Sequence, residues 1–227
     1  MKKFSKMNEA AWIIGTLLCA LGRVLCTKSG VGLSMIGAPP YIIHLKLAEK
    51  YPFFTQGTSE YVFQALLFVL VCAILRTVKV KHLFSFITAV ILGIVIDGWL
   101  FVFGGNSVYD ALWLRIICFV FGELFTAISI AFLFRTSLPL QMYEVFVLEI
   151  ASKFNIKKDA VKLWFDAGML VLSVLLALIL NGNLAGVGIG TIIITVVNAP
   201  LIKLFGKLLD RMFIFDLFFP SLGKLLK

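Results

Sequence analysis

Residues 82–103 read HLFSFITAVILGIVIDGWLFVF, and this stretch decides the class of fold. Asp97 is the only Asp, Glu, Lys or Arg residue in this stretch. About 20 consecutive apolar residues are enough to cross the hydrocarbon core of a bilayer as a helix. The stretch therefore predicts a transmembrane helix. Five further apolar segments of similar length predict five more, near residues 10–27, 59–76, 112–134, 159–180 and 186–206.

The composition agrees with a chain that lies almost wholly in the membrane. Of 227 residues, 61% are hydrophobic and 15% charged, and the mean hydropathy is +1.03. Soluble domains have about 45–50% apolar and about 25% charged residues. These values exclude a cytosolic enzyme, a secreted disulfide scaffold and a disordered chain. The four cysteines lie inside apolar runs, without the spacing of a disulfide framework or a metal site.

Positive charges predict the orientation of the six spans, because basic residues concentrate in cytoplasmic loops. Lys and Arg gather at residues 76–81, 153–162 and 203–211, whereas residues 104–110 and 181–185 contain none. Three lysines in the first external segment are an exception to this pattern. The distribution predicts that both termini are cytoplasmic, and it explains the net charge of +9 without a nucleic-acid partner.

Three segments fit neither a span nor a simple loop. Pro39 and Pro40 open one short apolar segment and Pro139 opens another, at the position that proline favours in a helix. Both segments are too short to cross the bilayer, so we expect half-helices that are either re-entrant or interfacial. Residues 212–227 contain four phenylalanines followed by lysines, which predicts an interfacial amphipathic tail on the cytoplasmic leaflet.

The two halves of the sequence match each other in order. FQA at residues 63–65 corresponds to FDA at 165–167, an offset of 102, and LGIV at 92–95 aligns with VNAP at 197–200, an offset of 105. Each unit holds three spans, and an odd number of crossings makes the two halves antiparallel. This arrangement is shared by many secondary transporters.

The fold prediction is therefore an all-α polytopic membrane protein with six transmembrane helices. The helices form two inverted-topology three-helix repeats, at residues 1–104 and 105–211. Each repeat carries one short proline-led half-helix or re-entrant segment. In such architectures the substrate site lies near the midplane, where discontinuous helices meet between the repeats.

Glycine and proline motifs in both halves resemble those of a known family. They are GVGLS at residues 30–34 with APPY at 38–41, GIVID at 93–97, and GVGIGT at 186–191 with NAPLIKLF at 198–205. In these motifs the chain resembles the YczE and YitT-like bacterial integral membrane proteins. The resemblance implies a bacterial cytoplasmic (inner) membrane protein with duplicated halves, and no settled activity comes with it.

Polar residues within apolar spans are costly, so each is a functional hypothesis. The carboxylates are interpreted either as a coupling site for H⁺ or Na⁺ or as partners of a buried arginine. The arginine either binds an anionic solute or pairs with a carboxylate, and the two amides are candidates for hydrogen bonds to a solute. The candidates are Arg23, Gln64, Asp97, Glu123, Asp166 and Asn198, with the half-helix starts at Pro39, Pro40 and Pro139.

These features favour a small secondary transporter of a polar or charged solute, with its site at the repeat interface. Two alternatives remain open at this stage, a non-transporting accessory or scaffold protein and a substrate-binding subunit of an energised importer. No nucleophile–base pair or zinc-ligand motif is present, so enzymatic activity is not expected. No cofactor or metal is expected, the partners are the bilayer and a small solute, and a homo-oligomer is left open.

Overall fold

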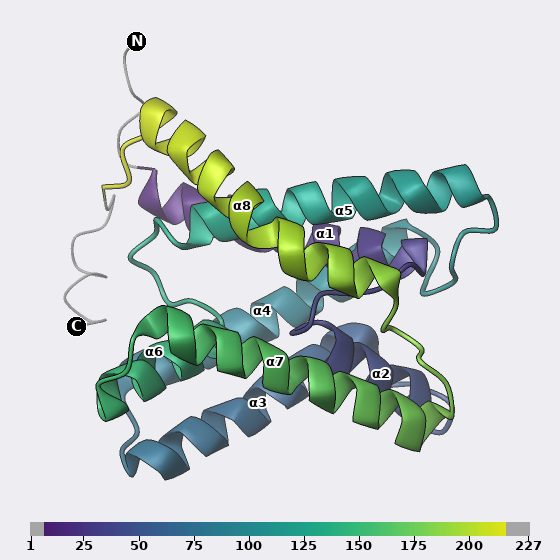
Figure 1. The fold of residues 1–227 in the computed structure, drawn as a ribbon, viewed down its shortest axis with the longest axis horizontal. Helices are drawn as coiled ribbons and strands as arrows, with labels where there is room; N and C mark the ends of the chain where they lie inside the picture. Colours follow the sequence, from purple (N-terminus) through teal and green to yellow (C-terminus); the bar gives the residue numbers. More distant parts are fainter. Residues whose placement is uncertain (1–6, 217–227) are drawn as a thin grey trace.

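The structure, a computed structural model, describes residues 7–216 and shows an all-helical chain (Figure 1). Within these residues there are eight α-helices and one π-helical turn. Their bounds are α1 Asn8–Ser29, α2 Ala38–Leu47, α3 Gln56–Leu75, α4 Val80–Val102, α5 Leu112–Leu133, α6 Met142–Phe154, α7 Lys158–Leu176 with η1 Ala177–Asn181, and α8 Ile189–Met212. Most of the predicted tail at residues 212–227 lies outside the described residues.

Six helices are long and apolar enough to cross a membrane, one for each predicted span. They are α1, α3, α4, α5, α7 continued by η1, and α8. The decisive stretch at residues 82–103 forms almost all of α4, which begins at Val80 and ends at Val102. Many apolar side chains on the outer faces of α7 and α8 are exposed, as expected for helices that face lipid.

Helix α1 lies at the centre of the molecule and packs along α5 and also against α4. The α1–α5 packing is close because glycines face each other: a methyl group at Gly22 would lie 2.6 Å from the carbonyl oxygen of Gly122. Helix α8 packs on α5, while α3 packs on α4, α2 and α6. In Figure 1, α5 and α8 lie above and α3, α6 and α7 lie below.

The two short helices occupy the positions expected for half-helices, with one correction. Pro39 and Pro40 lie in the first turn of α2, as predicted. Pro139, however, does not open α6, which begins three residues later at Met142. The carbonyl of Pro139 accepts hydrogen bonds from Trp12 Nε1 and Thr88 Oγ1, both at 3.2 Å. These contacts hold the residue in an extended segment that leads into the helix.

The extended segment before α6 runs along α1 into the interior of the bundle. Ser137 Oγ accepts a hydrogen bond from Asn8 at the start of α1, and the Gln141 amide donates to Cys19 Sγ, at 3.1 and 3.4 Å. At 1.5 Å per residue, the eleven-residue separation of Asn8 and Cys19 corresponds to about 16 Å along α1. Helix α6 therefore begins in the interior of the bundle, between the long helices.

Candidate functional site

An ion pair lies in the interior where α1 meets α3. Arg23 Nη1 of α1 is 2.5 Å from Glu60 Oε1 of α3, and the two side chains are only 7% and 4% exposed. Removing two charges from water is costly, and their attraction offsets this cost only when the remaining polar atoms are also bonded. The surroundings of the pair therefore decide whether it is stable.

Neutral side chains complete the hydrogen bonding around the pair. Gln64 Nε2 and the Tyr143 hydroxyl donate to Glu60 Oε1 at 2.9 and 3.0 Å. Arg23 Nη2 donates to Gln141 Oε1 at 3.0 Å. The five residues Arg23, Glu60, Gln64, Gln141 and Tyr143, here called the central cluster, join α1 and α3 to the start of α6.

The central cluster also explains why a helix can begin inside the bundle. The first amides of a helix lack intrahelical partners, and an unbonded buried amide is costly. Gln64 Oε1 accepts the backbone N–H of Met142 at 2.9 Å and so satisfies one of them. The partial positive charge at the start of α6 also lies beside the carboxylate of Glu60, which is a favourable arrangement.

Asp97 of α4 lies apart from the central cluster, beside the start of α3. Its Oδ1 accepts the backbone N–H of Gly57 at 2.8 Å and its Oδ2 accepts the Thr55 hydroxyl at 2.6 Å. A methyl group on Gly93 would lie 3.1 Å from the backbone carbon of Gly57, so α3 and α4 approach closely beside this carboxylate. Both oxygens of Asp97 are occupied in joining the two helices.

Glu123 and Asn198 lie on α5 and α8, in the layer opposite α3 and α6. Glu123 is 5% exposed. Glu123 Oε1 and Asn198 Oδ1 are both buried without a hydrogen-bond partner within residues 7–216. Buried polar atoms usually have partners, so these two oxygens are exceptions that require a reason.

Asp166 pairs within its own helix. Its carboxylate lies 2.9 Å from Lys162 Nζ, one turn earlier on α7, and the side chain is 19% exposed. The six candidates are thus divided among several locations. Arg23 and Gln64 belong to one cluster, whereas Asp97, Glu123, Asn198 and Asp166 do not join it.

Sequence reasoning missed three members of the central cluster, Glu60, Gln141 and Tyr143. Glu60 was overlooked because it lies at the edge of the predicted span at residues 59–76, where a charge costs little. Its spacing of four residues from Gln64 was a usable signal, because side chains at that spacing contact each other on a helix. No local signal identifies Gln141, whose role depends on the position of α6 beside α1.

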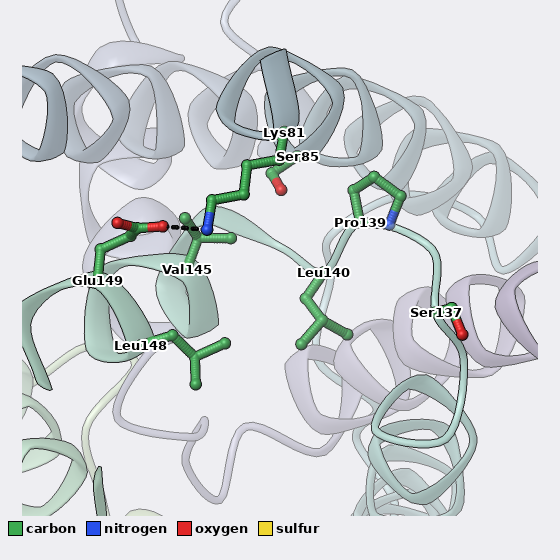
Figure 2. Close-up of a pocket in the computed structure, with 8 residues that line it drawn as sticks. All are labelled: Lys81, Ser85, Ser137, Pro139, Leu140, Val145, Leu148 and Glu149. Atoms are coloured by element: carbon green, nitrogen blue, oxygen red, sulfur yellow. Dashed lines mark ion pairs between the residues drawn. The ribbon is translucent and has the colours of Figure 1, made fainter. Parts of the chain in front are cut away.

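A cavity of about 160 Å³ lies between the start of α4, the start of α6 and the segment that precedes it. Figure 2 shows this α4–α6 cavity and its eight lining residues. They are Lys81, Ser85, Ser137, Pro139, Leu140, Val145, Leu148 and Glu149.

Glu149 is the carboxylate of the α4–α6 cavity and is surrounded by basic groups. Lys81 forms an ion pair with it, and Lys79 Nζ and His82 Nε2 lie 2.9 and 3.3 Å from its oxygens. Burial acts to raise the pKa of Glu149, but hydrogen bonds from Lys81, Lys79 and His82 outweigh burial and lower the pKa to about 2. The carboxylate is therefore ionised at neutral pH.

Residues 7–216 contain no group of three or more His, Cys, Asp or Glu side chains placed to hold a metal ion. The nitrogens of His44 contact the Phe54 carbonyl and Asn106, at 2.8 and 2.5 Å. The four cysteines are free thiols.

Comparisons with known proteins give a family without an assigned activity. A profile of DUF6198, described as a family of unknown function, matches residues 7–207. The uncharacterized protein YyaS of Bacillus subtilis (strain 168) is 28% identical over 204 residues, which cover 88% of this chain and 93% of that protein. No solved structure matches the chain significantly. The resemblance to YczE and YitT-like proteins is not confirmed by these comparisons.

Proposed function

The chain belongs to the DUF6198 family of unknown function, and we propose from its geometry that it is a secondary transporter of a small polar or charged solute. The observation that carries the proposal is the start of α6 beside the buried Arg23–Glu60 pair. A half-helix that begins at a charged cluster between long helices is an arrangement that transporters use for solute binding.

Helix packing supports an inverted repeat of α1–α4 and α5–α8. If the halves are equivalent, each contact of one half has a counterpart in the other. The α1–α4 contact corresponds to α5–α8, α2–α3 to α6–α7, and α3–α6 to α2–α7, and all six contacts are present. When α1–α4 are exchanged with α5–α8, the α1–α5 contact corresponds to itself. The repeat-related positions Gln64 and Asp166 also lie one turn after a charged residue, Glu60 and Lys162 respectively.

The packing departs from this symmetry at two contacts. Helix α4 packs against α6, but the repeat-related contact between α8 and α2 is absent from the described residues. Helix α3 packs against α4, but the described parts of α7 and α8 do not pack against each other. Transporters with inverted repeats alternate between two states, in which the two halves exchange conformations. The half that is open in one state is closed in the other. We infer that α7 and α8 approach each other in the alternate state while α3 and α4 separate.

Arg23 and Glu60 are the proposed solute groups, and Glu123 is the proposed coupling group. Glu123 is preferred to Asp97 because one of its oxygens is buried without a partner, whereas both oxygens of Asp97 accept hydrogen bonds. Lys79 and Lys81 lie with Glu149 at the end of the bundle where α1 begins, which supports cytoplasmic termini.

Proton coupling is tested in liposomes that contain the purified chain and an internal pH-sensitive dye. We expect one class among small carboxylic acids, amino acids and organic amines to change the internal pH when added outside. The Glu123→Gln variant is expected to abolish this signal, because an amide carries no exchangeable proton. The exposed Asp110 supplies the control variant, Asp110→Asn. An equal signal from Glu123→Gln and the control would reject Glu123 as the coupling group.

The two-state inference is tested by distances between spin labels in lipid nanodiscs. Val69 and Ile87 report on α3 and α4, and Val171 and Ile192 occupy the repeat-related positions on α7 and α8; all four side chains are 44–64% exposed. On a background without native cysteines, we expect a second, shorter distance for the α7–α8 pair and a second, longer one for the α3–α4 pair. A single distance for each pair, at neutral and at acidic pH, would contradict alternating access.

A second candidate function is that of a non-transporting accessory protein. It is favoured by the pairing of charges, since Arg23–Glu60 and Lys162–Asp166 form ion pairs that join helices without any solute. This function predicts no flux with any solute class and a single conformation in the distance measurement. The two experiments above therefore separate the two functions.

A further inference from the structure

The α4–α6 cavity is distinct from the central cluster and lies nearer to the end of the bundle where the described chain begins. Its walls come from α4, from the segment that precedes α6, and from α6 itself. Figure 2 shows Lys81 and Glu149 on one side of the cavity and Pro139 and Ser137 on the other.

The charged groups around the cavity have a positive excess. Lys79 and Lys81 both contact Glu149, which is the carboxylate among the lining residues. The carboxylate would keep Lys79 and His82 as partners if Lys81 turned toward the cavity. One lysine of the group is therefore free to contact a ligand without leaving Glu149 unpaired.

Ser85 provides the second, independent observation. The residue is 1% exposed and its hydroxyl lines the cavity. No hydrogen bond of this hydroxyl occurs within residues 7–216. The hydroxyl points toward the cavity (Figure 2), so it can donate a hydrogen bond to an acceptor that occupies the cavity.

A second hydroxyl donor lies across the cavity from Ser85. Ser137 Oγ accepts a hydrogen bond from Asn8 Nδ2 at 3.1 Å, which leaves its O–H free to donate. Lys81, Ser85 and Ser137 thus offer three donors to one space. The remaining walls are the apolar side chains of Pro139, Leu140, Val145 and Leu148.

We propose that the α4–α6 cavity binds a phosphate group through Lys81, Ser85 and Ser137. A phosphate carries several strong acceptor oxygens, which match one ammonium and two hydroxyl donors. The phosphate can belong to a free anion or to the headgroup of a lipid at the membrane interface, and the chemistry of recognition is the same. The proposal does not depend on transport.

The test measures thermal unfolding of the purified, delipidated full chain in detergent. Inorganic phosphate is titrated in one arm, at constant ionic strength against chloride, and phosphatidylglycerol is compared with phosphatidylcholine bicelles in the other. We expect stabilisation in at least one arm. Ser85→Ala and Lys81→Gln should each weaken the apparent affinity at least about tenfold, as loss of a donor to a charged group does. Lys46→Gln, a change at an exposed lysine that pairs with Glu49, should leave it unchanged.

The arms identify the source of the phosphate. Stabilisation by inorganic phosphate supports a free anion, and stabilisation by phosphatidylglycerol alone supports a lipid headgroup. If Lys81→Gln fails to fold because Glu149 loses a partner, Ser85→Ala and Ser137→Ala still test the site. The proposal is overturned if neither probe stabilises the chain, or if the serine variants bind as tightly as the Lys46→Gln control.

Discussion

Arg23→Met is expected to lower the free energy of unfolding by about 3–5 kcal/mol, the usual cost of removing one partner of a buried ion pair. The variant leaves the carboxylate of Glu60 in the interior with only the Gln64 amide and the Tyr143 hydroxyl as donors. Reversible unfolding in mixed detergent micelles, followed by circular dichroism, measures the change.

The double variant Arg23→Met, Glu60→Gln separates structural from functional roles of the pair. A neutral amide at residue 60 still accepts hydrogen bonds from Gln64 and Tyr143 and no longer needs a counter-charge, so most of the lost stability should return. If the pair also binds solute, the double variant remains without flux in liposomes. Flux restored in the double variant would show that the pair has a purely structural role. An Arg23→Met variant as stable as the parent would refute the predicted loss of stability.

Gly22→Ala is expected to lower the free energy of unfolding by about 1–3 kcal/mol through overpacking. A methyl group at this position would lie 2.6 Å from the Gly122 carbonyl oxygen and 2.9 Å from the Thr126 backbone nitrogen. Backbone atoms cannot rotate away as side chains do, so α1 and α5 must separate. Unfolding of the variant in the same micelles measures the loss.

Gly98 provides the matched control for this substitution, since a methyl group there would have no neighbour within 4 Å. Gly98→Ala is expected to raise the free energy of unfolding slightly, by about 0.5–1 kcal/mol. Alanine has fewer backbone conformations than glycine in the unfolded chain, so it loses less entropy when the helix forms. Equal effects of the two substitutions would show that helix propensity, and not α1–α5 contact, sets the result.

The spans could be predicted because they depend on local composition. An apolar run such as residues 82–103 forms a helix in lipid whatever its neighbours are, since every backbone amide must be bonded within the segment. The start of α2 at Pro39 and Pro40 is equally local, because proline fixes the backbone of a first helical turn. At Pro139 this local rule fails, because Trp12 and Thr88 hold its carbonyl outside the helix.

The partners of the polar residues could not be predicted in the same way. The sequence offered Asp97, Glu123 and Asp166 as possible carboxylate partners of Arg23, but the structure supplies Glu60. Which carboxylate faces an arginine depends on the rotation and depth of two separate helices. Hydropathy fixes neither the rotation nor the depth of a helix, since lipid does not distinguish one apolar helix face from another.

The sequence by itself determined that this protein is helical, that six of its segments are long and apolar enough to cross a membrane, and that short segments lie between them. These properties follow from the cost of unbonded backbone groups and of apolar surface in water. Each helix avoids both costs without the others, because it bonds its own backbone and places its apolar side chains in lipid. Only the tertiary structure decided that α6 begins beside Arg23 and Glu60, that Glu123 keeps an unpartnered oxygen and that α7 and α8 stand apart. Those results depend on the close packing of helices distant in the sequence, where glycines such as Gly22 and Gly122 determine how near two backbones can approach.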